Sequence, residues 1–456
     1  MDADTSDLQR LADDAIDLIQ QRGAAQAQGS AVEANVRATR TRLGVTRFAN
    51  SFVHQHVGED TTALELLVAV DGRTASTATT RTTPEALREA VDAVLDAARQ
   101  QPPDPHWPGA TPPASIPDEV RFDGATAEGD PATRAEHVRA FVNAGEGLDA
   151  AGYVDTDASW TAFASTAGQR AAGASTRATV DGIHQTPTSA GSAHQTSSRL
   201  ADLDGAAAGD RAAQRARDAA EFTDLDPGTL EVVLGPEAVA TLLTFFAVYG
   251  FNAKMHLEGA SFVELGAAQL DPAITILDDP EDPRAIGLPF DAEGSPRRPV
   301  TLVEQGVSRA LAHDRRTAHR AGATTTGGAV PGGESLGAVP LNVRLLPGQR
   351  TPEEMVASVE RGLLVTELNY VRVLEPKAQR ATGLTRNGTF LIEDGEVTGA
   401  VSNLRFTESF LDALAPGRVL GVGADDRLAD GEFGPGMVTC PSLHLAGFTF
   451  TGGARG

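Results

Sequence analysis

The stretch between residues 31 and 80 places the strongest constraint on the fold, because the hydrophobic pattern changes there from helical to strand spacing. Residues 6–22 carry apolar side chains three and four positions apart, which indicates an amphipathic helix. Residues 31–80 continue with alternating and apolar runs on both sides of Asp71–Gly72, a preferred two-residue hairpin turn. The chain is therefore expected to begin with a helix followed by antiparallel strands.

Helices and strands continue to alternate up to about residue 222. A helix is expected over Pro84–Ala98, with Thr83 as its N-cap and the proline at its first position. Residues 101–118 contain seven prolines, which is typical of an extended connection. The elements that follow are expected to be a helix over 131–150, strands between 154 and 200, and a helix over 207–220.

The remainder of the chain is predicted to be rich in β-structure. The turn at Asp224–Gly228 marks its beginning, and a strand and a buried helix over 236–249 follow. A capping box at Thr351–Glu354 is expected to start a helix that reaches about Leu364. Short strand-like runs separated by Gly and Asn fill the rest.

These patterns predict an α+β fold. An N-terminal α/β region with antiparallel strands and helices is followed by a β-rich C-terminal domain. The expected domains are residues 1–105, a middle segment with strands and helices over 106–222, and the C-terminal domain over 223–456.

The charge of the chain is strongly acidic, with a formal net charge of −24. Lys254 and Lys377 are the only two lysines among the 38 Lys and Arg residues, so the other 36 are arginine. An acidic, lysine-poor surface stays hydrated at high salt, and we interpret it as a halophilic signature. The same charge argues against binding to nucleic acid, which requires a basic surface to replace counterions.

Cysteine usage and hydropathy favour the cytoplasm. Cys440 is the single cysteine, so no intrachain disulfide can form, and a reducing compartment is the natural setting. The acidic N-terminus lacks the apolar segment of a signal peptide. The longest apolar run, 238–249, is too short to span a bilayer, so no membrane association is expected.

Histidine spacing argues against a conventional catalytic zinc site. Two histidines spaced as HExxH or HExxxH would lie on one helical face, and neither spacing occurs among the ten histidines of this chain. His54 and His56 could point to one side of a strand, although an exposed polar strand face is the simpler interpretation. The other pairs considered are His256 with Glu258, interpreted as a solvated turn, and His313 with His319, interpreted as a charged helix surface.

Other constellations also have simpler structural interpretations. Cys440 is expected to be a buried small hydrophobic residue, and no G-x-S-x-G elbow is present. The glycines of 327–333 and of Gly421–Gly423 are interpreted as turns, because they lack the complete phosphate-binding fingerprints. The acidic run 278–282 could bind a hard cation, but is interpreted as surface. The residues alone therefore predict no catalytic, cofactor-binding or metal-binding residue and no cofactor.

Several short sequence segments, taken in their order along the chain, resemble the TldD/PmbA family of peptidase-related proteins, which were once described as modulators of DNA gyrase. The resemblance covers nearly the whole chain. Its phrases are TRFANSFVHQ (46–55), VDGRTAS (70–76), LDPGTLEVVLGPEAVATLL (225–243), ITILDDP (274–280), LPFDAEGSPRRPVTLVEQGV (288–307), PLNVRLLPGQRTPEEM (340–355), RGLL (361–364) and SLHLAGFTFTGG (442–453).

The resemblance implies a paired system. In this family one subunit type, TldD, holds zinc through an HExxxH helix and a later cysteine, and the other type, TldE or PmbA, lacks these ligands. At the corresponding helix this chain has Thr244, Phe245 and Tyr249, and the stretch matched to the metal cysteine, 427–432, contains no cysteine. The resemblance therefore implies a metal-free subunit that pairs with a zinc-bearing one to degrade or trim unfolded peptides.

Three functions remain open at this point. The chain is the non-catalytic subunit of a heteromeric cytoplasmic metallopeptidase, with a TldD-like partner and a peptide substrate. Alternatively, it is a self-sufficient metallopeptidase with unconventional ligands such as His54, His56 or His256. The third alternative is a non-catalytic peptide-binding or scaffold protein that self-associates as a dimer.

Overall fold

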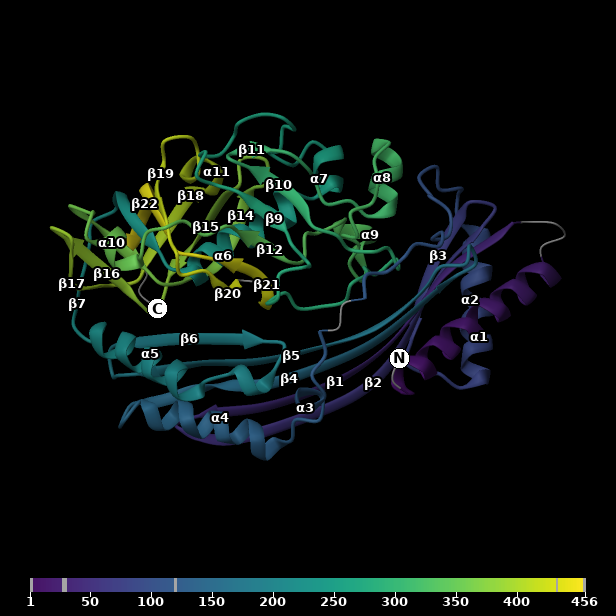
Figure 1. Ribbon diagram of the computed structural model, residues 1–456, viewed down its shortest axis with the longest axis horizontal. Coiled ribbons are helices and arrows are strands. Elements are labelled where there is room, and N and C mark those ends of the chain that lie inside the picture. The colour runs from purple at the N-terminus through teal and green to yellow at the C-terminus, as the bar shows by residue number, and fades with distance from the viewer. Residues whose placement is uncertain (1–2, 27–30, 119–120, 432–433, 454–456) are drawn as a thin grey trace.

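The computed structural model describes residues 3–26, 31–118, 121–431 and 434–453 of the chain. It contains helices and largely antiparallel sheets, and its C-terminal half is rich in strands, which confirms the predicted α+β class. Figure 1 shows a long curved sheet with helices on its outer side and the C-terminal half of the chain resting on its inner side. None of the helices within these ranges combines the length and the apolar character that crossing a bilayer requires.

The N-terminal sheet has the order β3-β2-β1-β4-β5-β6, and every pair in it is antiparallel. Because β1 pairs with β4 along almost its whole length, strands from the segments 1–105 and 106–222 share this one sheet. The strands are β1 (Val32–Ala49), β2 (Phe52–Val70), β3 (Arg73–Thr79), β4 (Asp149–Ser165), β5 (Arg170–Gln185) and β6 (Ala190–Ser197).

The predicted hairpin turn is confirmed between β2 and β3. Asp71 has φ of 48° and Gly72 has φ of 72°, so both central residues are in the left-handed region. Two consecutive positive φ values are typical of the turn that matches the right-handed twist of paired strands.

Helices cover one face of this sheet in two groups. Helices α1 (Ala3–Gln26) and α2 (Pro84–Gln100) pack together against one end, where Thr83 caps α2 as predicted by accepting from the amide of Ala86. Near the other end lie α3 (Gly124–Ala127), α4 (Pro131–Ala144) and α5 (Gly205–Asp218). Helix α4 ends six residues before the predicted 150 because Asp149 and Ala150 already belong to β4.

The C-terminal half contains two further sheets. The first has the order β11-β10-β9-β12-β21-β20, and the second has the order β14-β15-β18-β22-β8-β13-β16-β17-β7 with β19 paired to β22. The strands of the first are β9 (Ile276–Asp278), β10 (Val300–Glu304), β11 (Val307–Ser308), β12 (Val343–Leu345), β20 (Arg427–Gly431) and β21 (Gly434–Cys440). Those of the second are β7 (Phe222–Thr223), β8 (Gly228–Leu234), β13 (Arg361–Val365), β14 (Leu368–Glu375), β15 (Arg380–Thr385), β16 (Thr389–Glu393), β17 (Glu396–Val401), β18 (Leu404–Ser409), β19 (Val419–Val422) and β22 (Leu443–Gly453).

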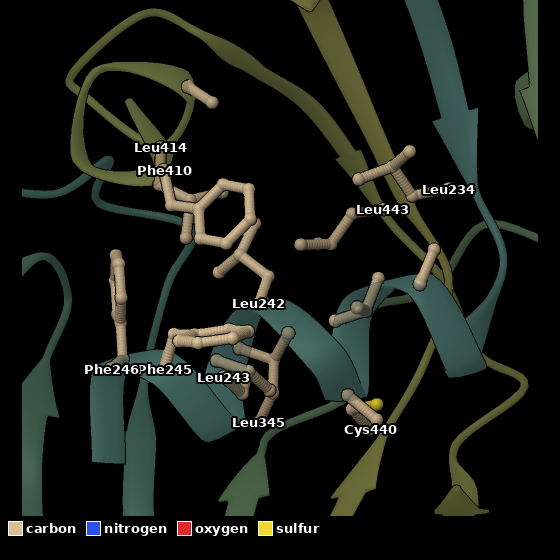
Figure 2. Packing of buried hydrophobic residues seen from close by; sticks show 14 of the residues in the cluster. Leu234, Leu242, Leu243, Phe245, Phe246, Leu345, Phe410, Leu414, Cys440 and Leu443 are labelled. Atoms are coloured by element: carbon tan, nitrogen blue, oxygen red, sulfur yellow. The ribbon is translucent and has the colours of Figure 1, made fainter. Parts of the chain in front are cut away.

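Helix α6 (Pro236–Phe245) lies between these two sheets and continues into a π-helical turn over Phe246–Gly250. All ten residues of α6 are buried, which confirms the prediction of a buried helix in this part of the chain. Figure 2 shows Leu242, Leu243 and Phe245 of this helix among side chains of several strands, with Cys440 beside its first turn. The Cys440 thiol donates to the carbonyl of Pro236 at 3.3 Å.

Shorter helices complete the C-terminal half. They are α7 (Ala253–Leu257), α8 (Arg315–Ala321), α9 (Gly333–Leu336), α10 (Pro352–Val356) and α11 (Phe410–Ala413). The capping box at Thr351–Glu354 is confirmed, but the predicted length of its helix is wrong, because α10 ends at Val356. Residues 361–365 form β13 instead, since their apolar side chains are buried in a strand that pairs with β8 and β16.

Replacing Leu242 by alanine tests the role of α6. Its side chain is fully buried, so we expect the substitution to lower the free energy of unfolding by about 2–5 kcal/mol through lost burial and a residual cavity. Urea unfolding followed by circular dichroism measures the change. Leu265→Ala is the matched control, because Leu265 is 55% exposed and its loss should cost less than about 0.5 kcal/mol. Equal effects of the two substitutions would contradict the assignment.

Candidate functional site

A cavity of about 440 Å³ lies where the N-terminal sheet meets the C-terminal half. Three of its lining strands, β6, β14 and β20, are each the terminal strand of a different sheet. A terminal strand keeps one row of backbone amides and carbonyls without a partner in its own sheet. The lining residues are Tyr153, Asp181, His194, Thr241, Glu367, Leu368, Asn369, Tyr370, Arg372, Arg386, Asp430 and Gly431.

One wall of the cavity is a row of polar side chains across β4, β5 and β6. Tyr153 pairs with Asp181, and Asp181 pairs with His194, so the three residues are direct cross-strand neighbours. Cross-strand neighbours project to the same face of a sheet. This face is opposite the one covered by α4, because the adjacent residue Val154 is buried with the helix residues Val138 and Phe141.

His194 is held among carboxylates from three elements. Its Nδ1 lies 3.2 Å from Asp181 and 3.9 Å from Asp430 of β20. Burial alone would lower the pKa of His194, but the negative charges of Asp181, Asp430 and Glu367 raise it to about 10. The imidazole is therefore a cation at neutral pH, and it joins the N-terminal sheet electrostatically to the C-terminal half.

The carboxylates around His194 differ in their environments. Burial raises the pKa of Asp430 to about 6, although the charge of His194 opposes the rise, and Thr196 donates to this carboxylate at 3.2 Å. Glu367 accepts from the Ser192 hydroxyl of β6 at 2.6 Å. Both contacts connect β6 with a segment of the C-terminal half, so β6 is positioned by the same groups that line the cavity.

Strand β14 contributes the most exposed aromatic side chain of the cavity. Tyr370 is 63% exposed and has φ of 51°, which is unusual for a residue with a bulky side chain. It occupies an irregularity in the pairing of β14 with β15, between Asn369 and Arg372. Strained backbone of this kind is concentrated at binding and catalytic sites, because the surrounding structure must be organised to hold it.

An ion pair between the buried Glu237 and the partly exposed Arg427 holds α6 against β20 behind the cavity. Both carboxylate oxygens of Glu237 accept from Arg427 at 2.9 Å. Burial alone would raise the pKa of Glu237, but the charges of Arg427, Arg215 and His194 lower it to about 2. Glu237 is therefore ionised at neutral pH and fixes the position of the edge strand that carries Asp430.

The structure brings together the positions that the resemblance matches to metal ligands, but the side chains there are not ligands. The hydroxyl of Thr244 donates to the carbonyl of Ala240 at 2.7 Å, and Phe245 stacks with Tyr249 at 6.1 Å between ring centroids. A Cβ atom on Gly431 would lie 2.6 Å from the Thr244 hydroxyl. Over the described ranges, no group of three or more His, Cys, Asp or Glu side chains could hold a metal ion.

The histidines considered from the sequence are not brought together at this cavity. His54 and His56 are exposed on β2, whereas His256 lies in α7, which Figure 1 shows in the C-terminal half away from that strand. The solvated turn predicted for His256 is therefore a short helix, with Glu258 as its C-cap residue. His319 is exposed in α8 as predicted, and His313 precedes that helix and is half-buried.

The prediction that residues 278–282 form an acidic surface is wrong. Asp278, Asp279 and Asp282 are all buried. Arginines from other loops and strands neutralise them, since Asp278 lies 3.4 Å from Arg297 and Arg344 lies 3.1 Å from both Asp279 and Asp282. These pairs make the acidic run part of the structural framework.

The two glycine segments behave differently. Gly327 has φ of 75°, as expected for a turn, whereas Gly421 lies within strand β19, so the turn predicted there is wrong.

Cys440 is fully buried, as expected, and burial raises the pKa of its thiol well above the usual value.

The residues that line the cavity carry no sequence motif. His194, Asp181 and Asp430 come from three strands, and their spacing along the chain follows no known ligand or catalytic pattern. The one sequence signal near the cavity was the segment 225–243 that resembles the family, because it includes most of α6. This helix lies behind the cavity, and its residue Thr241 lines the cavity.

Comparisons with known proteins agree with this architecture. The model of the PmbA/TldA metallopeptidase C-terminal domain matches residues 227–452. A metalloprotease from Methanothermobacter thermautotrophicus is 27% identical over 220 residues, which cover 47% of each chain. A metalloprotease TldD homolog from Buchnera aphidicola is 24% identical over 242 residues, or 49% of this chain and 48% of that protein. The chain thus spans about half the length of the curated relatives it matches.

Solved structures share the fold along nearly the whole chain. TldE from Thermococcus kodakarensis superposes with a TM-score of 0.84 and 18% identity, covering 96% of this chain and 100% of that one. A Thermotoga maritima protein described as a modulator of DNA gyrase has a TM-score of 0.81 and 20% identity, covering 97% and 99%. The family model, the relatives and the shared fold together place the chain in the TldD/PmbA metallopeptidase family.

Proposed function

We propose that this protein is the zinc-free, TldE/PmbA-like subunit of a heteromeric cytoplasmic metallopeptidase that degrades or trims unfolded peptides. The observation that carries the proposal is the replacement of metal ligands in an otherwise complete family fold. Thr244, Phe245 and Tyr249 occupy the matched helix positions, and the stretch matched to the metal cysteine, 427–432, contains no cysteine. None of these three side chains is of the Cys, His, Asp or Glu type that binds zinc. A TldD-like partner would supply the zinc and the hydrolytic step.

In this proposal the contribution of the chain is to bind extended peptide. An extended peptide can add to an exposed sheet edge through main-chain hydrogen bonds, which are largely independent of peptide sequence. The edge strands β6, β14 and β20 all line the cavity, so its walls offer unpaired backbone groups on more than one side. Sequence-tolerant binding of this kind suits a peptidase that acts on unfolded chains.

The pairing experiment tests the proposal directly. The chain is purified alone and together with a TldD-type subunit that carries HExxxH, and both samples are assayed for cleavage of an unfolded peptide and for zinc by mass spectrometry. We expect the chain alone to be inactive with zinc well below one ion per chain, and the pair to be active. Stoichiometric zinc and chelator-sensitive activity in the chain alone would instead establish a self-sufficient enzyme.

A peptide-binding protein without proteolysis is the second candidate. The exposed Tyr370 on the edge of β14 favours it, because such a surface can hold a peptide without any hydrolytic partner. Peptide binding by a dimer of this chain, with no gain of cleavage when the TldD-type subunit is added, would favour this candidate over the first.

Tyr370→Gly tests the contribution of β14 to peptide binding. Glycine tolerates the positive φ at this position, so we expect the free energy of unfolding to change by less than about 1 kcal/mol. Loss of the aromatic contact should weaken peptide binding by about 1 kcal/mol, or about fivefold in affinity. Titration calorimetry with an unfolded peptide measures the affinity.

Leu374→Ala is the control for this substitution. Leu374 lies on the same strand and is 57% exposed, but it does not line the cavity. Its replacement should leave peptide affinity unchanged. If both substitutions weaken binding equally, β14 does not contribute through the cavity.

His194→Gln tests the electrostatic link between the two halves. The folded-state pKa of His194 is raised to about 10, so its stabilising contribution is fully present below the unfolded value of about 6.5 and is lost as pH rises through 10. We therefore expect the difference in melting temperature between wild type and His194→Gln to shrink from pH 7 to pH 10. His319→Gln, at an exposed position, should show no such trend. A constant difference for His194→Gln would contradict the link.

A further inference from the structure

A second cavity, of about 270 Å³, lies on the helix-covered face of the N-terminal sheet. It is bounded by β1, β2 and β4 and by α3, α4 and the segment that joins these two helices. Thr156 lines it, whereas Tyr153 lines the first cavity, and residues an odd number apart in a strand project to opposite faces. The two cavities are therefore separated by the thickness of the sheet, and the peptide-binding proposal does not account for the second one.

Glycines form the floor of this cavity. Gly44 and Gly58 are direct partners in the pairing of β1 with β2. A Cβ atom on Gly44 would lie 2.5 Å from Nη1 of Arg134, so the guanidinium occupies the space that a side chain would need. At Gly58 a Cβ atom would meet only Nε2 of His56, at 4.0 Å, so the space above this glycine is open.

Arg134 is a buried cation whose contacts are all neutral. Its exposure is only 2%, and its guanidinium donates to the carbonyl of Gly129 at 2.7 Å and to the hydroxyls of Thr156 at 2.8 Å and Thr46 at 3.3 Å. Among the described residues, its hydrogen-bond partners are two hydroxyls, a carbonyl and the His56 ring, and none of them is a carboxylate. Burial lowers the pKa of Arg134, and the more distant charges of Asp130 and Asp155 oppose this effect only in part. A buried charge without a counterion is costly, so the site favours a negative partner.

His56 adjoins this cavity, because its ring contacts Arg134 and lies beside Gly58, and both of these residues line the cavity. Its Nδ1 lies 3.5 Å from Nη2 of Arg134 and 3.3 Å from the hydroxyl of Thr46. A guanidinium can only donate, so Nδ1 must accept, and the neutral ring then carries its proton on Nε2 beside Gly58. The neighbouring guanidinium repels a metal cation from this imidazole, which disfavours the metal-ligand interpretation of His56.

Arg42 adds a second positive charge at the rim. Its side chain is 38% exposed and lies over the ring of Trp160. Asp60, the acidic residue that shares this face, is held at 2.7 Å by Arg40 and at 3.5 Å by Arg42. Glu59 also borders the cavity, but the alternation of β2 directs its side chain to the other face. The arginines at the cavity therefore exceed the carboxylates that face it, in a chain whose net charge is −24.

We propose that this cavity binds a small oxyanion of the phosphate class, with Arg134, Arg42 and His56 as its donors and Gly44 and Gly58 as its floor. Guanidinium groups match the geometry of phosphate oxygens and remain charged at all physiological pH values. The cavity volume accommodates either inorganic phosphate or the phosphate group of a small ester. The site is independent of zinc and of the peptide cavity on the opposite face.

Titration calorimetry at constant ionic strength tests the proposal, with inorganic phosphate and glycerol phosphate as separate probes. We expect saturable binding of at least one probe to the wild-type chain, above a potassium chloride background. Tighter binding of glycerol phosphate identifies an ester as the ligand, and equal or tighter binding of inorganic phosphate identifies the free ion. No saturable binding of either probe would overturn the proposal and leave Arg134 as a structural residue.

Gly58→Val locates the site without altering any of the proposed donors. Its side chain would extend into the open floor of the cavity, and we expect roughly a tenfold or greater loss of phosphate affinity, because charge-assisted hydrogen bonds are blocked. Gly399→Val is the matched control, since Gly399 is also a strand glycine with no atom near its missing Cβ, in β17. Its affinity should equal that of wild type. Unchanged phosphate affinity in Gly58→Val would overturn the placement, even if phosphate binds elsewhere.

Discussion

The complete burial of α6 between two sheets is the constraint on which the rest of the C-terminal half depends. A helix with no exposed face must satisfy every polar group internally, and Nη2 of Arg427 does so for both carboxylate oxygens of Glu237 in the first turn. The same pair fixes β20, which brings Asp430 and Gly431 to the cavity. In a zinc-bearing relative such a helix would present ligands, whereas here Thr244 bonds back to the helix and Phe245 joins the aromatic core.

Charge is distributed unevenly over the molecule, and the difference separates two kinds of site. Around the first cavity, carboxylates from both halves enclose the cationic His194, so the joint between the halves depends on opposite charges that lie close together. On the other face of the sheet, Arg134 is buried among neutral acceptors. The positive charge of His194 is balanced in part by the carboxylates around it, whereas the positive charge of Arg134 has no counterion among the described residues. This contrast is why the first supports the architecture and the second indicates a ligand.

Local sequence signals predicted the elements that depend on local physics. The Asp71–Gly72 turn, the Thr83 N-cap and the capping box at Thr351 all formed as expected, because turn and cap geometry is decided within a few residues. The predictions that were wrong concern segments decided by distant partners. Residues 361–365 became a strand because β8 and β16 lie on either side, and the acidic run 278–282 was buried because Arg297 and Arg344 neutralise it.

The sequence by itself determined the α+β class, the buried character of the 236–249 region, the resemblance to the TldD/PmbA family and the lack of HExxxH spacing, since each of these is a local or ordered pattern of residue types. Only the tertiary structure decided which side chains meet at the cavities. His194 and Asp430 are separated by more than half the chain, and Arg134 reaches Gly44 and His56 only because α4 packs on β1 and β2. Sheet pairing and helix packing create such neighbours, and neither leaves a fixed spacing along the sequence.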